Sequence, residues 1–110
     1  MLVTLSLLDD DLNIIAVCGF EGFDGVGIEG MIAGRPGNKR FIKEVFKYVF
    51  DQLQVRRFTV RVSENNEAAY RFDLKLGFIE EGRLRQAGKD GEDIIILGML
   101  RNECKWLSNE

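Results

Sequence analysis

Residues 34–40 (GRPGNKR) combine the residue types that are suited to binding an anion. The stretch holds two glycines, the only proline of the chain and three basic side chains, although the chain as a whole is acidic. It follows an apolar run that ends at Ala33 and precedes an amphipathic segment that starts at Phe41. The first N–H groups of a helix have no partner within it, and the helix dipole favours negative charge there. We therefore predict a phosphate-binding loop, with an ordinary strand-to-helix turn carrying solvated Lys and Arg as the alternative.

The side chains available for acid–base catalysis are restricted because the chain has no histidine. This excludes Ser-His-Asp and Cys-His catalysis and His-ligated metal sites. Cys18 and Cys104 are far apart and lack metal-ligand spacing, so one disulfide is possible but not required. The run Asp9–Asp11 is interpreted as a solvated turn, because it lacks the spaced ligands and the glycine of a calcium loop. We expect no bound metal, and acid–base chemistry by Asp, Glu, Tyr, Lys, Cys or water.

The composition is that of one globular domain over residues 1–110, with 45% hydrophobic and 30% charged residues. The formal net charge of -3 disfavours non-specific binding to nucleic acid. No apolar run approaches the roughly 20 residues of a membrane span, and the first residues lack a signal-peptide layout. We therefore expect a cytoplasmic protein that binds neither nucleic acid nor membrane, with residues 102–110 as a C-terminal tail.

Apolar periodicity predicts six strands and two helices. The strands are expected at residues 2–8, 13–20, 25–33, 56–62, 78–85 and 94–100, and the helices at 41–53 and 66–76. The order is therefore βββ-α-β-α-ββ, which fits an α+β fold with a mixed sheet and two helices. The first two strands are joined by a short acidic turn and should form an antiparallel hairpin.

Local signals support these boundaries. The first helix has apolar residues at i, i+3 or i+4, i+7 and i+8 over residues 41–53, with Asn38 as its expected N-cap. Asn66 can cap the second helix, and Gly77 can end it. The strand at 56–62 alternates strictly between apolar and polar residues, so one of its faces should be buried.

The strand before the basic loop is unusually rich in glycine. Gly25, Gly27 and Gly30 fall within or beside residues that otherwise favour a strand. Glycine weakens a strand and often marks a bulge or a close approach of the backbone to a ligand. We therefore expect one of these two features here.

The second half of the chain carries two short motifs at a recognisable spacing. Asn66-Glu67-Ala68-Ala69 opens the second helix, and Lys75-Leu76-Gly77-Phe78 closes it, followed by Glu81-Gly82 and a final apolar strand. Over residues 13–101 the chain resembles the GCN5-related N-acetyltransferase (GNAT) superfamily. It is most similar to the ribosomal-protein-type branch and to small phage-encoded members. The basic loop lies where the family has its pyrophosphate loop.

The resemblance implies binding of acetyl-CoA and transfer of its acetyl group to an amine of a protein or a small molecule. It also implies which residues contact CoA. The strand backbone would pair with the pantetheine arm, the loop would hold the pyrophosphate, and the second helix would line the channel. The strand residues are Met31, Ile32 and Ala33. The loop residues are Arg35, Pro36, Gly37, Asn38, Lys39 and Arg40, and the helix residues are Asn66, Ala69 and Phe72.

Several positions depart from the family pattern. The loop has one glycine after Arg35 and bulky residues where the family has small ones, so phosphate should approach less closely. Many members have a tyrosine four residues before the glycine that ends the second helix, and it protonates the departing thiolate. Asp73 stands there instead as the catalytic candidate. A carboxylate with its usual pKa is a poor proton donor at neutral pH, and burial could raise that pKa, although no residue in the sequence shows that it does. Tyr70 is a possible substitute, with a structural position in the core or at its rim as the alternative. A general base could be Glu29 or Asp24; the alternatives are a solvated or paired Glu29 and catalysis by positioning without a dedicated base.

The resemblance also implies a fold that lacks the strand and two helices with which the family usually begins. Apolar sheet surface and an unpaired edge should then be exposed, and a homodimer or a partner protein could cover them. The alternative to an enzyme is therefore a catalytically weak or inactive GNAT-fold module that binds a protein partner. If the chain is phage-encoded, that partner would be a host protein and the location the host cytoplasm.

Overall fold

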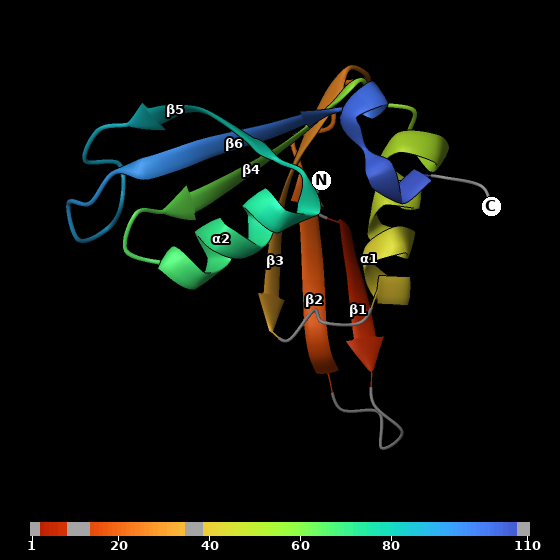
Figure 1. Cartoon of the computed structure of the whole chain (residues 1–110), viewed down its shortest axis with the longest axis horizontal. Coiled ribbons are helices and arrows are strands. Elements are labelled where there is room, and N and C mark those ends of the chain that lie inside the picture. The colour runs from red at the N-terminus through yellow and green to blue at the C-terminus, as the bar shows by residue number, and fades with distance from the viewer. Residues whose placement is uncertain (1–2, 9–13, 35–38, 108–110) are drawn as a thin grey trace.

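The computed structural model describes residues 3–8, 14–34 and 39–107, which form a mixed sheet with two helices (Figure 1). The six strands lie in the order β1-β2-β3-β4-β6-β5. They are β1 (Val3–Leu8), β2 (Ile14–Glu21), β3 (Gly27–Gly34), β4 (Arg57–Ser63), β5 (Ile79–Leu84) and β6 (Ile94–Leu100). The helices are α1 (Lys39–Phe46), which continues as η1 (Lys47–Gln52), and α2 (Glu67–Leu76). The predicted element order and α+β class are confirmed.

The sheet is antiparallel except at one place. β1 pairs with β2, β2 with β3, β4 with β6 and β5 with β6, all antiparallel. β3 and β4 are parallel, with α1 and η1 as the connection between them. The predicted β1–β2 hairpin is confirmed, and the continuously apolar β6 lies inside the sheet. The parallel pair is therefore the junction between an N-terminal antiparallel half and a C-terminal one.

The alternation in β4 separates the two faces of the sheet. Phe58, Val60 and Val62 are buried, as predicted. Arg57, Thr59 and Arg61 alternate with them, so they lie on the opposite face. We call the face that carries Arg57, Thr59 and Arg61 the arginine face.

Both helices pack on the buried face, because aromatic rings from both halves of the chain meet there. Phe46 of α1 lies 5.8 Å from Phe58 and 6.0 Å from Phe78 between ring centroids. Phe58 and Phe78 are 5.4 Å apart in an edge-to-face arrangement. Leu76 of α2 is buried in the same cluster. Such pairs contribute about 0.5–1.5 kcal/mol each beyond the burial of their area, so this cluster holds the helices in place.

The first helix differs from its prediction in its second half. Residues 47–52 form a π-helix, and the N–H of Leu53 donates to the carbonyl of Tyr48, five residues back, at 2.9 Å. Apolar pairs recur every four residues here, and in an α-helix of 3.6 residues per turn that repeat drifts by about 40° each time. A wider turn counters the drift, so Val49 and Phe50 remain fully buried. Asn38, the expected N-cap, lies outside the described residues.

The second helix begins and ends as predicted. The Asn66 side-chain oxygen accepts a hydrogen bond from the N–H of Ala69 at 3.2 Å, which is an N-cap. Gly77 has a φ of 117°, and its N–H donates to carbonyls of the last helical turn. Only glycine adopts such a φ without strain, so Gly77 lets the chain leave the helix.

The C-terminal segment beyond β6 docks on the helices. The Trp106 indole stacks on Phe46 at 6.2 Å, and its N–H donates to the carbonyl of Leu76 at 2.8 Å. The Arg101 guanidinium bonds the carbonyl of Phe50 and the Asp51 carboxylate. Trp106, within the C-terminal tail, is therefore docked on both helices. Across the described residues, none of the helices has the length and apolar character needed to cross a bilayer.

Candidate functional site

The sheet opens between its two parallel strands. β3 and β4 pair only over Gly27–Gly30 and Arg57–Val60. Beyond Gly30, residues Met31–Gly34 continue along β2 while β4 takes another direction (Figure 1). The backbone groups of Met31–Gly34 that face away from β2 therefore have no strand partner among the described residues. We call this backbone the open edge of β3, and it needs hydrogen-bond partners from elsewhere.

Gly30 is the last residue of β3 that pairs with β4, and the group packed against it is a core side chain. A Cβ at this position would lie 2.6 Å from Cε1 of Phe58, closer than real Cβ contacts. The ring of Phe58 therefore takes the space above β3. The close approach that the sequence suggested for a ligand is, at Gly30, an approach by a core side chain.

The start of α1 supplies positive charge near the open edge. Lys39 and Arg40 are exposed in the first turn, which holds no acidic residue. Gly34 and Lys39 are five residues apart in sequence, so the helix start lies within roughly 18 Å of the strand end. Helix dipole and basic side chains together favour an anion here. The intervening loop residues Arg35, Pro36, Gly37 and Asn38 lie outside the described residues.

The residues predicted to line the CoA channel lie on the sheet-facing side of α2. Ala69 and Phe72 are partly buried and pack against the hydrophobic cluster. Asn66 is exposed at the N-terminus, where its oxygen is used for capping and its amide nitrogen is left for other contacts. On β3, Met31 is 67% exposed. The backbones of Ile32 and Ala33 pair with β2 on one side and contribute to the open edge on the other.

Asp73 is the one charged residue buried among the described residues. It is 8% exposed, and burial raises its pKa to about 7. The sequence left open whether burial raises the pKa of this carboxyl, and it does so here because packing removes the group from water without supplying an opposite charge. At neutral pH a large fraction of Asp73 carries a proton.

Tyr70, the other candidate acid, is already engaged. Its hydroxyl donates to the Glu80 carboxylate on β5 at 2.7 Å. That hydrogen bond raises the pKa of Tyr70. β5 is separated from β3 by β6 and β4 in the sheet. The catalytic role for Tyr70 stays a prediction, and the hydrogen bond to Glu80 competes with it.

Glu29 lies on the arginine face. Its carboxylate accepts a hydrogen bond from Nε of Arg61 at 2.8 Å, which joins β3 to β4. Met31, two residues further along the strand, shares the face of Glu29. As a general base Glu29 would act next to this arginine, and its role stays a prediction.

The second candidate base, Asp24, stabilises a turn. Its carboxylate accepts hydrogen bonds from the N–H groups of Val26 and Gly27, each at 2.9 Å. These bonds lower the pKa of Asp24, which makes it a weaker base. The turn precedes β3, at the opposite end of the strand from the open edge. Its position and its bonding both disfavour catalysis by Asp24.

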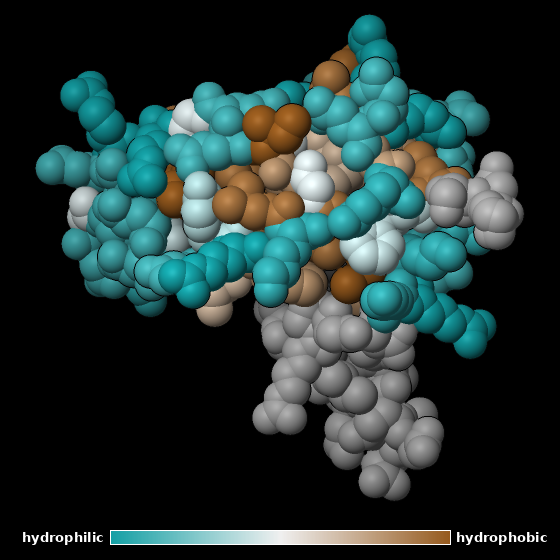
Figure 2. Space-filling view, viewed as in Figure 1, coloured by the Kyte–Doolittle hydropathy of each residue, from teal (hydrophilic) through white to brown (hydrophobic). Residues whose placement is uncertain are grey.

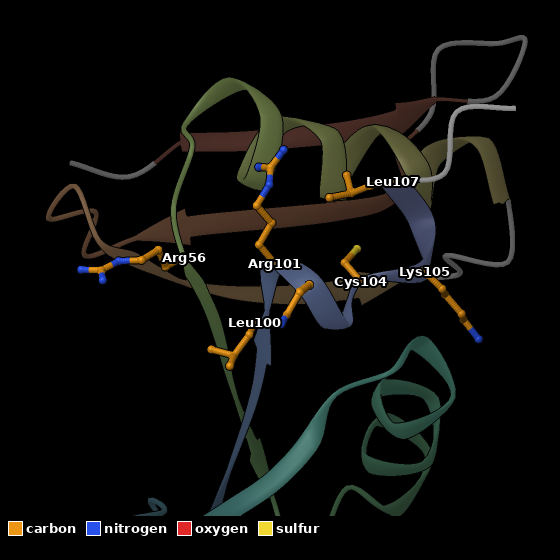
Figure 3. A pocket seen from close by; sticks show the side chains of 7 residues that line it. Arg56, Leu100, Arg101, Cys104, Lys105 and Leu107 are labelled. Carbon is orange, nitrogen blue, oxygen red and sulfur yellow. The ribbon is translucent and has the colours of Figure 1, made fainter.

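A separate hollow of about 740 Å³ lies where β4 begins and β6 ends (Figure 3). It is lined by Arg56, Leu100, Arg101, Asn102, Cys104, Lys105 and Leu107. Arg101 is fixed there by its bonds to η1. Burial raises the pKa of the Cys104 thiol. None of the predicted site residues that the structure describes lines this hollow, which lies at the end where β3 and β4 pair and not where they separate.

Solved structures with a similar fold are N-acetyltransferases. The Vibrio cholerae spermidine N-acetyltransferase SpeG in complex with CoA and spermine matches with a TM-score of 0.81 and 19% identity, over 97% of this chain and 69% of that one. Mutant forms of the spermidine/spermine N-acetyltransferase SpeG from the same organism match at 0.79 and 20%, over 92% and 68%. SpeG with manganese ions matches at 0.78 and 20%, over 90% and 65%. No protein-family model and no curated protein matches the sequence.

At these identities the likeness establishes the fold. The chain has the GNAT acyltransferase fold, with the order of elements along the chain that was expected from its sequence. Sequence reasoning missed the unpaired carboxyl of Asp73, the Tyr70–Glu80 bond and the Glu29–Arg61 pair. Asp73, Tyr70 and Glu29 are titratable residue types and could be singled out from sequence, but the burial of Asp73 and the partners of Tyr70 and Glu29 depend on how separate elements pack.

Proposed function

We propose that this protein binds acetyl-CoA and transfers its acetyl group to an amine. The observation that carries the proposal is the open edge of β3, which leads into the basic start of α1. A strand edge without a partner suits an extended ligand with amide groups, and the pantetheine arm of CoA has two. A helix start with Lys39 and Arg40 suits the pyrophosphate that follows it. The fold shared with CoA-bound SpeG supports the same placement.

In this proposal each group of residues has one task. Met31, Ile32 and Ala33 pair with pantetheine through their backbone. The residues from Arg35 to Arg40 hold the pyrophosphate. Asn66, Ala69 and Phe72 contact the ligand from α2. The acceptor amine then approaches from the arginine face, where Glu29 can orient it or accept its proton.

The reaction is direct transfer within one ternary complex. Acetyl-CoA is already an activated thioester, so holding a neutral amine against its carbonyl supplies much of the acceleration. The neighbouring SpeG structure contains CoA and spermine, which is a polyamine. By analogy the acceptor class is an amine, and a primary amine on a small molecule or on a protein both fit.

The first test is calorimetric titration with acetyl-CoA. The combined variant Arg35→Glu and Lys39→Glu should abolish binding without loss of the folded state, because two positive charges at the helix start become negative. The matched control is Arg85→Glu with Lys89→Glu, which makes the same charge change at exposed positions between β5 and β6. Loss of binding in both double variants, or in neither, would contradict the assignment of the loop. If acetyl-CoA binds and no amine is acetylated, the protein is the binding module.

We further propose a homodimer. The described residues leave large apolar side chains at the surface, and Figure 2 shows apolar residues reaching solvent among hydrophilic ones. On the sheet these are Met31, Ile79, Leu84 and Leu100, between 40% and 67% exposed. A second copy could cover such a surface. Light scattering at micromolar concentration should give twice the monomer mass, and a monomer would refute this part of the proposal.

A further inference from the structure

Four large apolar side chains project from the sheet into solvent. Among the strand residues whose side chains the structure describes, these are the ones at least 40% exposed: Met31, Ile79, Leu84 and Leu100. Residues directly opposite one another on paired strands point to the same face. Leu100 is opposite Arg57, and Ile79 is opposite Gly98, which is itself opposite Thr59. Leu100 and Ile79 therefore both lie on the arginine face.

The other two side chains reach the same face. Leu84 is opposite Ile94, and Ile94 is opposite Ser63, which alternates with buried residues on β4. Met31 shares its side of β3 with Glu29, which lies on the arginine face. The four side chains come from three strands, and the register of the sheet shows that they gather on one face.

The apolar surface is continuous over β5 and β6. Ile96 is opposite both Arg61 and Gly82, so it also lies on the arginine face, and like Ile94 it is half-buried. A Cβ at Gly82 would meet no described atom within 4 Å, so this part of the face is open. We call this group of side chains the outer apolar cluster: Ile79, Leu84, Ile94 and Ile96. An exposed apolar patch with a charged rim is typical of a protein–protein contact.

The arginines of this face are already paired with its carboxylates. Nε of Arg61 donates to Glu29 at 2.8 Å. The Arg57 guanidinium bonds Glu81, and this pair crosses β6 directly above Gly98. The two pairs contribute no net charge, and neither needs a new partner when water is removed from the face. A face of this kind fits a second copy of itself, because like charges do not meet across the contact.

The free edge of β5 is less suited to self-association than the face. β5 is the last strand of the sheet. Its pairing with β6 shifts register between Glu80 and Gly82, and such an irregularity bends a strand away from a new partner. The charged side chains of Glu80 and Arg83 are engaged with Tyr70 and Glu64. Two copies therefore meet more favourably through the face.

The same face carries the proposed approach of the acceptor amine. Glu29, Thr59, Gly98 and Ile79 form one row across β3, β4, β6 and β5. Three strand spacings of about 4.8 Å place Ile79 roughly 14 Å from Glu29 along this row. A protein that covers the outer apolar cluster therefore borders the space above Glu29.

We propose that two copies of this chain pack through their outer apolar clusters, and that each copy forms one wall of the acceptor site of the other. This rests on the proposed function and names the surface of the proposed homodimer. Both helices lie on the other face of the sheet, so within the described part of one chain no helix stands above the row from Glu29 to Ile79. The second copy supplies that wall and limits the positions an amine can take.

Methyl NMR of the unmodified chain with a soluble gadolinium chelate tests the interface. The chelate attenuates the signals of groups that reach solvent. Leu84 on β5 and Leu74 on α2 are matched probes, because each is 40% exposed in the single chain. The Leu74 signals should be attenuated and the Leu84 signals protected. Equal attenuation of the two residues overturns the interface, and this result does not depend on whether any variant folds.

A pair of double variants tests the contact by mutation. Ile79→Asp with Leu84→Asp should give a monomer in light scattering at micromolar concentration, because four carboxylates would enter one apolar contact. The control is Phe23→Asp with Leu74→Asp, which makes the same charge change away from the sheet. The exposed fractions are 51% and 40% in both pairs. The control should remain a dimer, and a dimer for Ile79→Asp with Leu84→Asp overturns this interface but leaves the homodimer standing.

Acetyl transfer to spermine, and to a panel of other primary amines, tests the shared acceptor site. The monomeric variant should bind acetyl-CoA as the wild type does, because the open edge of β3 and the start of α1 are unchanged. Its kcat/KM for the amine should fall about tenfold or more through the loss of one wall. Unchanged kcat/KM in a monomer overturns the shared site. A wild type that acetylates no amine overturns the proposed transfer and the shared site together, whereas a monomeric wild type overturns the homodimer and this inference and leaves CoA binding standing.

Discussion

Asp73→Asn is expected to change how the stability of the protein depends on pH. In the unfolded chain this carboxyl titrates near its ordinary value of 3.8, whereas burial raises its pKa to about 7 in the folded protein. Between these values the unfolded state has released the proton and the folded state still holds it. The free energy of unfolding therefore falls as pH rises from 4 to 7, and levels off above 7. Below pH 3.8 both states are protonated, so the contribution vanishes there.

The magnitude follows from the size of the shift. Each pKa unit corresponds to about 1.4 kcal/mol, so a shift of about three units amounts to roughly 4 kcal/mol at and above pH 7. This is a large fraction of the 5–15 kcal/mol that stabilises a typical domain. Asparagine has the shape of the protonated acid and does not titrate. Between pH 4 and pH 8 the wild type should therefore lose roughly 4 kcal/mol of unfolding free energy through Asp73, and Asp73→Asn should not show this loss.

Urea unfolding at several pH values between 4 and 8.5 measures this difference. Fluorescence of Trp106, the only tryptophan, reports unfolding because its ring stacks on Phe46 in the folded protein. Asp90→Asn is the matched control, since Asp90 is exposed in the turn between β5 and β6. The control should follow the wild type at every pH. If Asp73→Asn also runs parallel to the wild type, the carboxyl is ionised in the folded state and the reasoning fails.

Two further predictions concern stability. Gly30→Ala should destabilise the protein by about 1–3 kcal/mol, because the new Cβ would meet the ring of Phe58 at 2.6 Å, whereas Gly82→Ala, with nothing within 4 Å, should cost far less in the same urea assay. Equal costs would contradict the packing at the strand divergence. Asn66→Ala should cost about 1 kcal/mol through loss of its N-cap bond to Ala69, and thermal unfolding that is unchanged would rule out that bond.

Local sequence signals predicted most of the fold. The alternation of β4, the cap at Asn66 and the glycine at the end of α2 each depend on residues a few positions apart, and all three are confirmed. The π-helix was missed because its cause is a mismatch between the four-residue apolar repeat of the sequence and the 3.6 residues per turn of an α-helix. A four-residue apolar repeat fits neither a straight α-helix nor a loop, and packing of Val49 and Phe50 decides between them.

The candidate site was less predictable because it depends on contacts between distant segments. From sequence the pKa of Asp73 was left open because it depends on burial, and the burial of Asp73 against the sheet raises it. Tyr70 and Glu29 were plausible catalytic residues, and the side chains that hold them, Glu80 and Arg61, come from other strands. Composition alone predicted a phosphate-binding loop at residues 34–40, and the family resemblance implied that it binds the CoA pyrophosphate, which stays a proposal.

An NMR titration of ¹⁵N-labelled protein with CoA tests the central claim most directly, because it reports both binding and its location. The claim predicts that amide signals of Met31–Gly34 and of the first turn of α1 shift together and saturate. Signals of β1 and of the hollow around Arg56, Cys104 and Lys105 should remain in place. Shifts confined to that hollow, or no shift at millimolar CoA, would contradict the proposal that the open edge of β3 and the start of α1 form a CoA site.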